Sequence, residues 1–116
     1  MMNWEVVTLL EFETWFGDLG RREQLAVLAA AERLADQGPN LGRPYVDSVA
    51  TSSYHNMKEL RPRGAGKNIR ILFIFDRQRR AVLLLGGDKS RDPDRWYRKS
   101  ISRADRLYER YLALGT

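Results

Sequence analysis

Three apolar segments joined by short connections constrain the fold of this chain more than any other feature. The segments are Met57–Arg61, Ile69–Phe75 and Ala81–Leu85, each with the composition of a β-strand. Residues 62–67 between the first two contain two glycines, and residues 76–80 form a short polar turn. Parallel neighbours need a crossover of about a dozen residues or more, so these connections predict three consecutive antiparallel strands.

Two long helices are expected on either side of these strands. Residues 20–37 are rich in Ala, Leu, Glu and Arg, and Gly38-Pro39 ends that helix. Its expected apolar stripe is Leu25, Leu28, Ala31, Leu34 and Ala35. The second helix follows Asp92-Pro93 and runs to about residue 112. Its expected stripe is Tyr97, Ile101, Ala104, Tyr108 and Tyr111.

The N-terminal region completes the predicted order of elements. Residues 3–7 alternate as a short strand, residues 11–16 can form one or two helical turns, and residues 40–56 are expected to be a loop. The order is βα(α)βββα, an α+β fold with a small antiparallel sheet packed against helices. A length of 116 residues supports one modest core, so we expect a single domain over residues 1–116.

Charge is distributed unevenly along the chain. Residues 58–116 contain 16 Lys and Arg against 7 Asp and Glu, whereas residues 1–57 contain 4 against 8. This asymmetry predicts that the C-terminal half binds a polyanion. Cysteine is absent, which excludes disulfides, thiolate metal sites and a cysteine nucleophile. With no signal peptide and no apolar run near 20 residues, we expect a cytoplasmic protein without a membrane partner.

Hairpin geometry predicts where the strand cations lie. Pairing about Gln78 places Arg70 opposite Gly86, on the sheet face away from Ile69 and Ile71. The adjacent Gly86-Gly87 carries no side chains and is expected to leave an open concavity.

The preceding hairpin adds further cations to the same end of the sheet. Pairing about Gly64-Ala65 places Arg61 near Asn68 and Lys58 near Ile71. The expected cluster therefore comprises Arg61, Arg70 and Lys89, with Lys58 close by.

A phosphodiester is the natural ligand of such a cluster, because guanidinium groups match phosphate oxygens in bidentate fashion. RNA can be cleaved by its own 2′-OH, so the protein need supply no nucleophile, metal or cofactor. It must supply a base, an acid and donors for the developing charge. Arg70 and Arg61 can be the donors, and cationic crowding that lowers a Lys pKa can make Lys58 or Lys89 a proton-transfer group. Trp96 and Tyr97 can stack on a base, and the Tyr97 hydroxyl can also donate a proton.

The same residues resemble a known family. The ordered set is Lys58-Glu-Leu-Arg61, a glycine-containing loop, Ile69-Arg70-Ile-Leu-Phe, Lys89 and a closing helix centred on Ala104. It is similar, over almost the whole chain, to the RelE/ParE superfamily and most of all to the HigB-like branch of type II toxins. The resemblance implies a toxin that enters the A site of the 70S ribosome and cleaves mRNA there. It also implies a cognate antitoxin, often of the helix-turn-helix type.

The resemblance also assigns roles to residues. Arg70 takes the position that contacts the scissile phosphate, and the other expected catalytic residues are Lys58, Arg61, Lys89 and Tyr97. Further RNA contacts are expected from Arg63, Lys67, Arg77, Arg79, Arg80 and Trp96. Many relatives have paired basic residues after the last strand, whereas here Asp88 precedes Lys89. Some relatives use histidine for proton transfer, and the one histidine here, His55, precedes the first strand of the meander.

The same residues can also have purely structural roles. Arg70 can simply pair with Glu59 across the sheet, and the arginines of residues 77–80 can form a solvated tip that protects the sheet edge. Two other functions also fit the chain. One is a ParE-like toxin that acts on DNA gyrase, and the other is a non-catalytic nucleic-acid-binding module.

Overall fold

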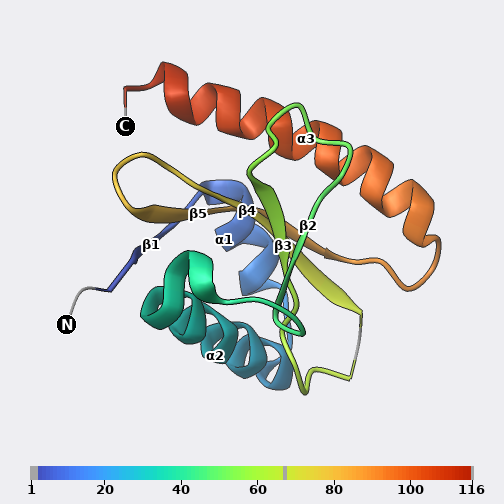
Figure 1. Ribbon diagram of the computed structural model, residues 1–116. Helices are drawn as coiled ribbons and strands as arrows, with labels where there is room; N and C mark the ends of the chain where they lie inside the picture. The colour runs from blue at the N-terminus through green and yellow to red at the C-terminus, as the bar shows by residue number, and fades with distance from the viewer. Residues whose placement is uncertain (1–2, 67, 116) are drawn as a thin grey trace.

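A five-stranded sheet with helices on both faces makes up the protein (Figure 1). The computed structural model describes residues 3–66 and 68–115. The elements are β1 (Glu5–Thr8), α1 (Leu10–Gly17), α2 (Arg21–Gln37), the 3-10 turn η1 (Gly38–Asn40), β2 (Val46–Ser48), β3 (Met57–Leu60), β4 (Ile69–Phe75), β5 (Arg80–Asp88) and α3 (Pro93–Ala113). The strand order is β1-β5-β4-β3-β2, and the predicted α+β class is confirmed.

The sheet is mixed, where the sequence predicted an antiparallel one. Strands β3, β4 and β5 form the expected antiparallel meander. Strand β1 pairs parallel with β5. The chain between the two strands is long enough for β5 to run alongside β1 in the same direction. The predicted loop 40–56 contains β2, which pairs with β3 and aligns Asp47 with Glu59. A three-residue strand with one buried position leaves too little alternation to be recognised.

The helices divide the core into two layers. Helices α1 and α2 lie on one face of the sheet and α3 lies along the other (Figure 1). The layer on the α1/α2 face includes Val27, Leu34, Leu60, Ile71 and Phe73. The layer on the α3 face includes Met57, Leu72, Ile74, Ile101 and Tyr108. Successive β4 residues therefore point to opposite helical layers. None of the described helices is long and apolar enough to cross a membrane.

The expected apolar stripe is confirmed for α3 and partly wrong for α2. Four of the five α3 positions are buried and Tyr97 is half-buried. In α2 the buried residues are Val27, Ala30 and Leu34, while Leu25 and Leu28 are 54% and 50% exposed. An Ala- and Leu-rich helix offers more than one apolar stripe, so its sequence alone did not identify the face that packs.

A β-bulge changes the predicted strand register. From the hairpin turn to Phe73 the β4–β5 pairs follow the predicted register, but the shift between Leu72 and Phe73 places Arg70 opposite Gly87, not Gly86. On β3 the register is displaced by two residues, so Lys58 lies opposite Phe73 instead of Ile71.

The expected concavity at Gly86-Gly87 is absent. A Cβ on Gly86 would lie 2.4 Å from the Trp15 ring, and one on Gly87 would lie 2.3 Å from the Trp96 ring. The two glycines admit one indole ring on each face of the sheet, so the space left by their missing side chains is filled.

Candidate functional site

Arg61 and Arg70 come together on the sheet face covered by α3. Arg70 follows the alternation of Leu72 and Ile74, both in the α3 layer. Arg61 directly follows β3 and points to the same face as Glu59, two residues earlier. The side chains of Arg61 and Arg70 are 30% and 15% exposed, so both guanidinium groups are partly desolvated.

Glu59 lies between the two arginines and is the buried acidic residue of the described core, 3% exposed. Its Oε2 accepts hydrogen bonds from Arg61 Nε and Nη2 at 2.9 and 2.7 Å. Its Oε1 accepts the Tyr97 hydroxyl at 2.6 Å and lies 3.9 Å from Arg70 Nε. A purely structural role for Arg70 would require an ion pair with Glu59. That ion pair is present, but its nitrogen–oxygen distance of 3.9 Å is long.

The start of α3 supplies two aromatic residues to the same place. Burial first, and then the hydrogen bond to Glu59, raises the pKa of Tyr97 to about 12. Tyr97 therefore stays protonated at neutral pH, so it cannot be a general base there. Trp96 covers Gly87, the cross-strand partner of Arg70, and packs edge-on against Tyr97 with ring centres 5.2 Å apart. Arg61 and Arg70 therefore lie together, as the hairpin pairing predicted, and Tyr97 and Trp96 of α3 lie beside them.

An open hollow of about 440 Å³ lies beside this group. Its lining comprises Arg61, Pro62, Arg63, Gly64, Ala65, Gly66, Asn68, Arg70 and Ser90. Arg70 of β4 and two arginines of the β3–β4 connection, Arg61 and Arg63, thus surround one space, with the backbone of a glycine-rich loop at its edge. Lys89 is adjacent, because its backbone N–H donates to the Asn68 carbonyl at 3.0 Å. Such a surround suits an oxyanion such as a phosphate.

Two of the expected cations stand apart from this description. Lys58 lies opposite Phe73, whose side chain is in the α1/α2 layer, so Lys58 faces away from Arg70. The expectation that Lys58 lies with the cluster is therefore wrong, since alternation along β3 separates it from Arg61. Lys67, the other residue expected to contact RNA, lies outside the described residues.

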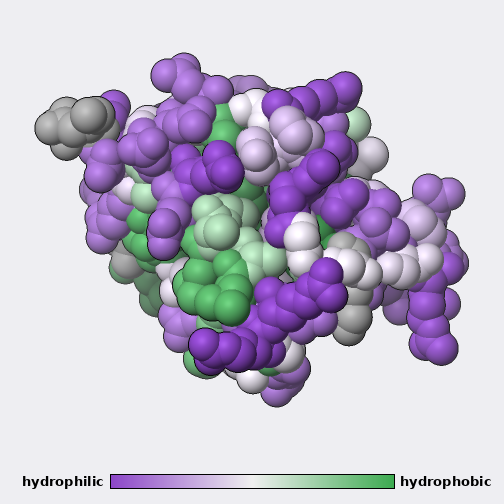
Figure 2. Space-filling model, turned by 90° about the horizontal axis from the view of Figure 1, so that it is seen from below, coloured by the Kyte–Doolittle hydropathy of each residue, from purple (hydrophilic) through white to green (hydrophobic). Residues whose placement is uncertain are grey.

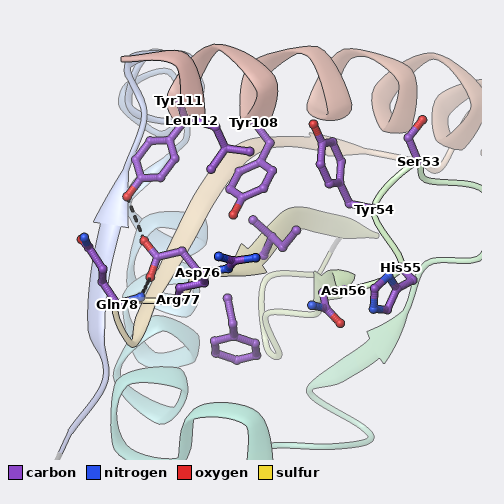
Figure 3. A pocket seen from close by; sticks show the side chains of 12 residues that line it. Ser53, Tyr54, His55, Asn56, Asp76, Arg77, Gln78, Tyr108, Tyr111 and Leu112 are labelled. Atoms are coloured by element: carbon purple, nitrogen blue, oxygen red, sulfur yellow. Dashed lines mark hydrogen bonds between the residues drawn. The ribbon is translucent and has the colours of Figure 1, made fainter. Parts of the chain in front are cut away.

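The cations of the β4–β5 turn lie at the opposite end of β4, about 20 Å along the strand from Arg70. Arg77 and His55 line a second hollow of about 690 Å³, to which α3 contributes Tyr108 and Tyr111 (Figure 3). Arg80 is held by Asp76 at 2.7 Å and Arg79 stacks on Trp4 at 4.6 Å. Arg77 and Arg79 are exposed, as expected of a solvated tip, whereas the Arg80 side chain is only 18% exposed and is paired with Asp76.

Sequence reasoning missed the members of the site that are not cations. The sequence predicts Glu59 only as a partner for Arg70, although its two-residue spacing from Arg61 also indicates a shared face. Asp47, whose carboxylate lies 3.2 Å from Arg61, was hidden in the undetected strand β2. Ser90 carries no signal in the sequence that would have selected it.

Comparison with known proteins identifies the family. The family described as "Phage derived protein Gp49-like" matches residues 14–109. This chain belongs to that family. It is 51% identical over 108 residues to a Mycobacterium tuberculosis protein named "Putative toxin HigB3", covering 93% of each chain. It is 43% identical over 100 residues to "Putative toxin HigB2" of the same organism, covering 85% of this chain and 50% of that protein's length.

The fold of this Gp49-like chain also resembles a solved structure. That structure is the toxin–antitoxin complex RelBE2 of Mycobacterium tuberculosis, matched with a TM-score of 0.56 over 74% of this chain and 98% of the other. At 18% identity the likeness shows a shared fold. The two HigB relatives confirm the resemblance to HigB-like toxins, and the shared fold agrees with the expected RelE-like architecture.

Proposed function

We propose that this chain is the toxin of a type II toxin–antitoxin system, acting in the cytoplasm to inhibit translation by cutting mRNA on the ribosome. The relatives named as toxins support the first part. The observation that carries the second is the hollow surrounded by Arg61, Arg63 and Arg70. A phosphodiester matches both its charge and its donors.

The reaction requires no group beyond the RNA and the side chains. The 2′-oxygen attacks the adjacent phosphorus, the bond from phosphorus to the 5′-oxygen breaks, and a 2′,3′-cyclic phosphate forms. A base takes the proton of the 2′-OH, and an acid gives a proton to the departing 5′-oxygen. The guanidinium groups stabilise the charge that develops on the non-bridging oxygens.

The roles follow from position. Arg70 binds the scissile phosphate, and Arg61 and Arg63 bind the same or the adjacent phosphate. Proton transfer falls to the groups beside the hollow, Lys89 and the protonated Tyr97. Trp96 offers a ring on which a base can stack.

The test is to induce the chain with and without the neighbouring gene, and to map the 5′ ends of cellular transcripts. We expect cuts in phase with the reading frame, relieved by co-expression of the neighbour. Arg70→Ala should reduce cleavage on programmed ribosomes by about 10²–10³-fold while far-UV circular dichroism is unchanged. Arg103→Ala, which removes the same charge from an exposed position on α3, is the matched control.

The outcomes separate the competing functions. Growth arrest with intact mRNA contradicts the proposal, and an SOS response with unchanged transcripts favours action on gyrase. Salt-dependent RNA binding without cleavage on ribosomes favours a non-catalytic module.

A further inference from the structure

Helix α2 carries a second apolar stripe that the core does not use. Leu25 and Leu28, one turn apart, are 54% and 50% exposed, whereas Val27, Ala30 and Leu34 face the sheet. Figure 2 shows the molecule from the α2 side, with a hydrophobic patch bordered by strongly hydrophilic side chains. Exposed leucines at helical spacing on a helix that is already anchored are available to bind a partner.

Leu25 stands in a shallow groove of about 580 Å³ between α2 and the loop that precedes β4. The groove is lined by Arg21, Arg22, Leu25, Ala26, Arg63 and Gly64. Arg22 bridges its two sides, since its Nε donates to the Gly64 carbonyl at 3.1 Å. The groove therefore has an apolar floor, and Arg22 links α2 to the loop across it.

The charges around this floor are of one sign. The three charged lining residues, Arg21, Arg22 and Arg63, are all arginines and all exposed. A ligand that fits must combine an apolar side chain for the floor with carboxylates for the rim. The exposed side of α2, about 25 Å long, suits a second helix.

We propose that this groove and the Leu25–Leu28 stripe bind an acidic amphipathic helix of a partner protein. This inference rests on the proposed function, under which that partner is the antitoxin. The helix inserts one apolar side chain beside Leu25, and its carboxylates pair with Arg21, Arg22 and Arg63.

The position of the groove gives this binding a consequence for activity. Arg63 and Gly64 line both the groove and the hollow beside Arg70. A partner carboxylate that pairs with Arg63 removes a cation from the surroundings of the phosphate. A partner carboxylate that pairs with Arg22 competes with the hydrogen bond from Arg22 to the Gly64 carbonyl. The partner therefore weakens RNA binding from a neighbouring surface without filling the hollow itself.

The test measures binding of the full chain to the protein encoded by the neighbouring gene, using variants that differ in the sign of one charge. Leu25→Glu should weaken the Kd by about 100-fold or more, because it removes apolar contact and places like charges together. Leu25→Lys should weaken it by about tenfold or less, since its stem covers the floor and its ammonium faces carboxylates. Leu114→Glu, on a leucine beyond α3 that is 72% exposed, should leave the Kd unchanged.

Cell growth and RNA cleavage are measured separately for each variant. We expect Leu25→Glu to arrest growth like the wild type and to escape neutralisation by the neighbour. The inference is overturned if the neighbour fails to bind the wild type, if Leu25→Glu binds normally, or if Leu25→Lys is as weak as Leu25→Glu. It is also overturned if the chain alone dimerises through Leu25. If the neighbour binds through Leu25 but no RNA is cut, this inference stands and the proposed ribonuclease activity fails.

Discussion

Replacing Glu59 by glutamine tests whether one buried carboxylate organises the site. The change keeps the shape of the side chain and removes its charge. A glutamine has one carbonyl oxygen, so it can accept from Arg61 or from Tyr97 but not from both. With the oxygen toward Arg61, the NH₂ group faces the Tyr97 hydroxyl, which must turn its own proton away to accept, so a hydrogen bond to a charged group is replaced by a neutral one.

The size of the effect follows from the contacts that are lost. A hydrogen bond to a charged group contributes about 1.5–3 kcal/mol, and Glu59 accepts two from Arg61 and one from Tyr97. Arg61 is 30% exposed and also pairs with Asp47, which reduces the penalty of leaving it behind. We therefore expect Glu59→Gln to lower the free energy of unfolding by about 2–3 kcal/mol. For 116 residues this corresponds to a fall in Tm of about 8–12 °C.

Calorimetry and urea unfolding at neutral pH measure this loss. Glu32→Gln is the matched control, because Glu32 is exposed on α2 and the same chemical change there should cost under about 0.5 kcal/mol. A Tm for Glu59→Gln within about 2 °C of this control would refute the reasoning. It would mean that Arg61 and Tyr97 find equivalent partners in water.

Three further changes test other parts of the structure. Tyr97→Phe should reduce the loss of stability at alkaline pH. The Tyr97 pKa is about 12 in the folded state against an ordinary 10.0, so the wild type loses stability as the pH rises from 10 to 12. Urea unfolding at a series of pH values measures this loss, and an equal loss in both proteins contradicts the prediction. Burial opposes charge on Asp76, but hydrogen bonds from Arg80, Gln78 and Tyr111 outweigh it and lower its pKa. Asp76→Asn should therefore destabilise the fold by about 1–3 kcal/mol at pH 7, and the difference should shrink as pH falls below 3.8, which acid titration of both proteins checks. Lys58→Ala should leave ribosome-dependent cleavage within about threefold of wild type, because Lys58 faces the α1/α2 layer. A loss of cleavage as large as that of Arg70→Ala would show that Lys58 does act in the site.

Much of the fold was predictable because short connections leave few topologies. The meander and α3 required only the strand and helix patterns of the chain. The bulge that moves Arg70 from Gly86 to Gly87 was not predictable, because no local pattern marks Leu84 as the residue of β5 that is skipped in the pairing. The parallel pairing of β1 depends on contacts between distant segments, which no local pattern encodes.

The candidate site was predictable for its cations and not for the acid between them. Arg61 and Arg70 were placed together by hairpin pairing, a prediction that tolerated the errors in register. Strand alternation separates Lys58 from Arg61, but pairing along the strands gives no weight to the face on which a side chain lies. Glu59 is buried only because β2 and α3 cover it, so its role depends on tertiary packing.

The ion pairs of the two arginines indicate that Arg70 gains more from binding a phosphate than Arg61 does. Arg61 already shares its charge with Glu59 at 2.7 Å and Asp47 at 3.2 Å. Arg70 Nη1 donates to a backbone carbonyl, while its Nε is buried, 3.9 Å from Glu59, with no hydrogen bond in the described part of the chain. An unsatisfied buried donor costs about 1–3 kcal/mol, so a ligand oxygen that reached it, or drew Arg70 closer to Glu59, would recover that energy on binding. Arg61 offers no such gain, because a phosphate must compete with two carboxylates for it.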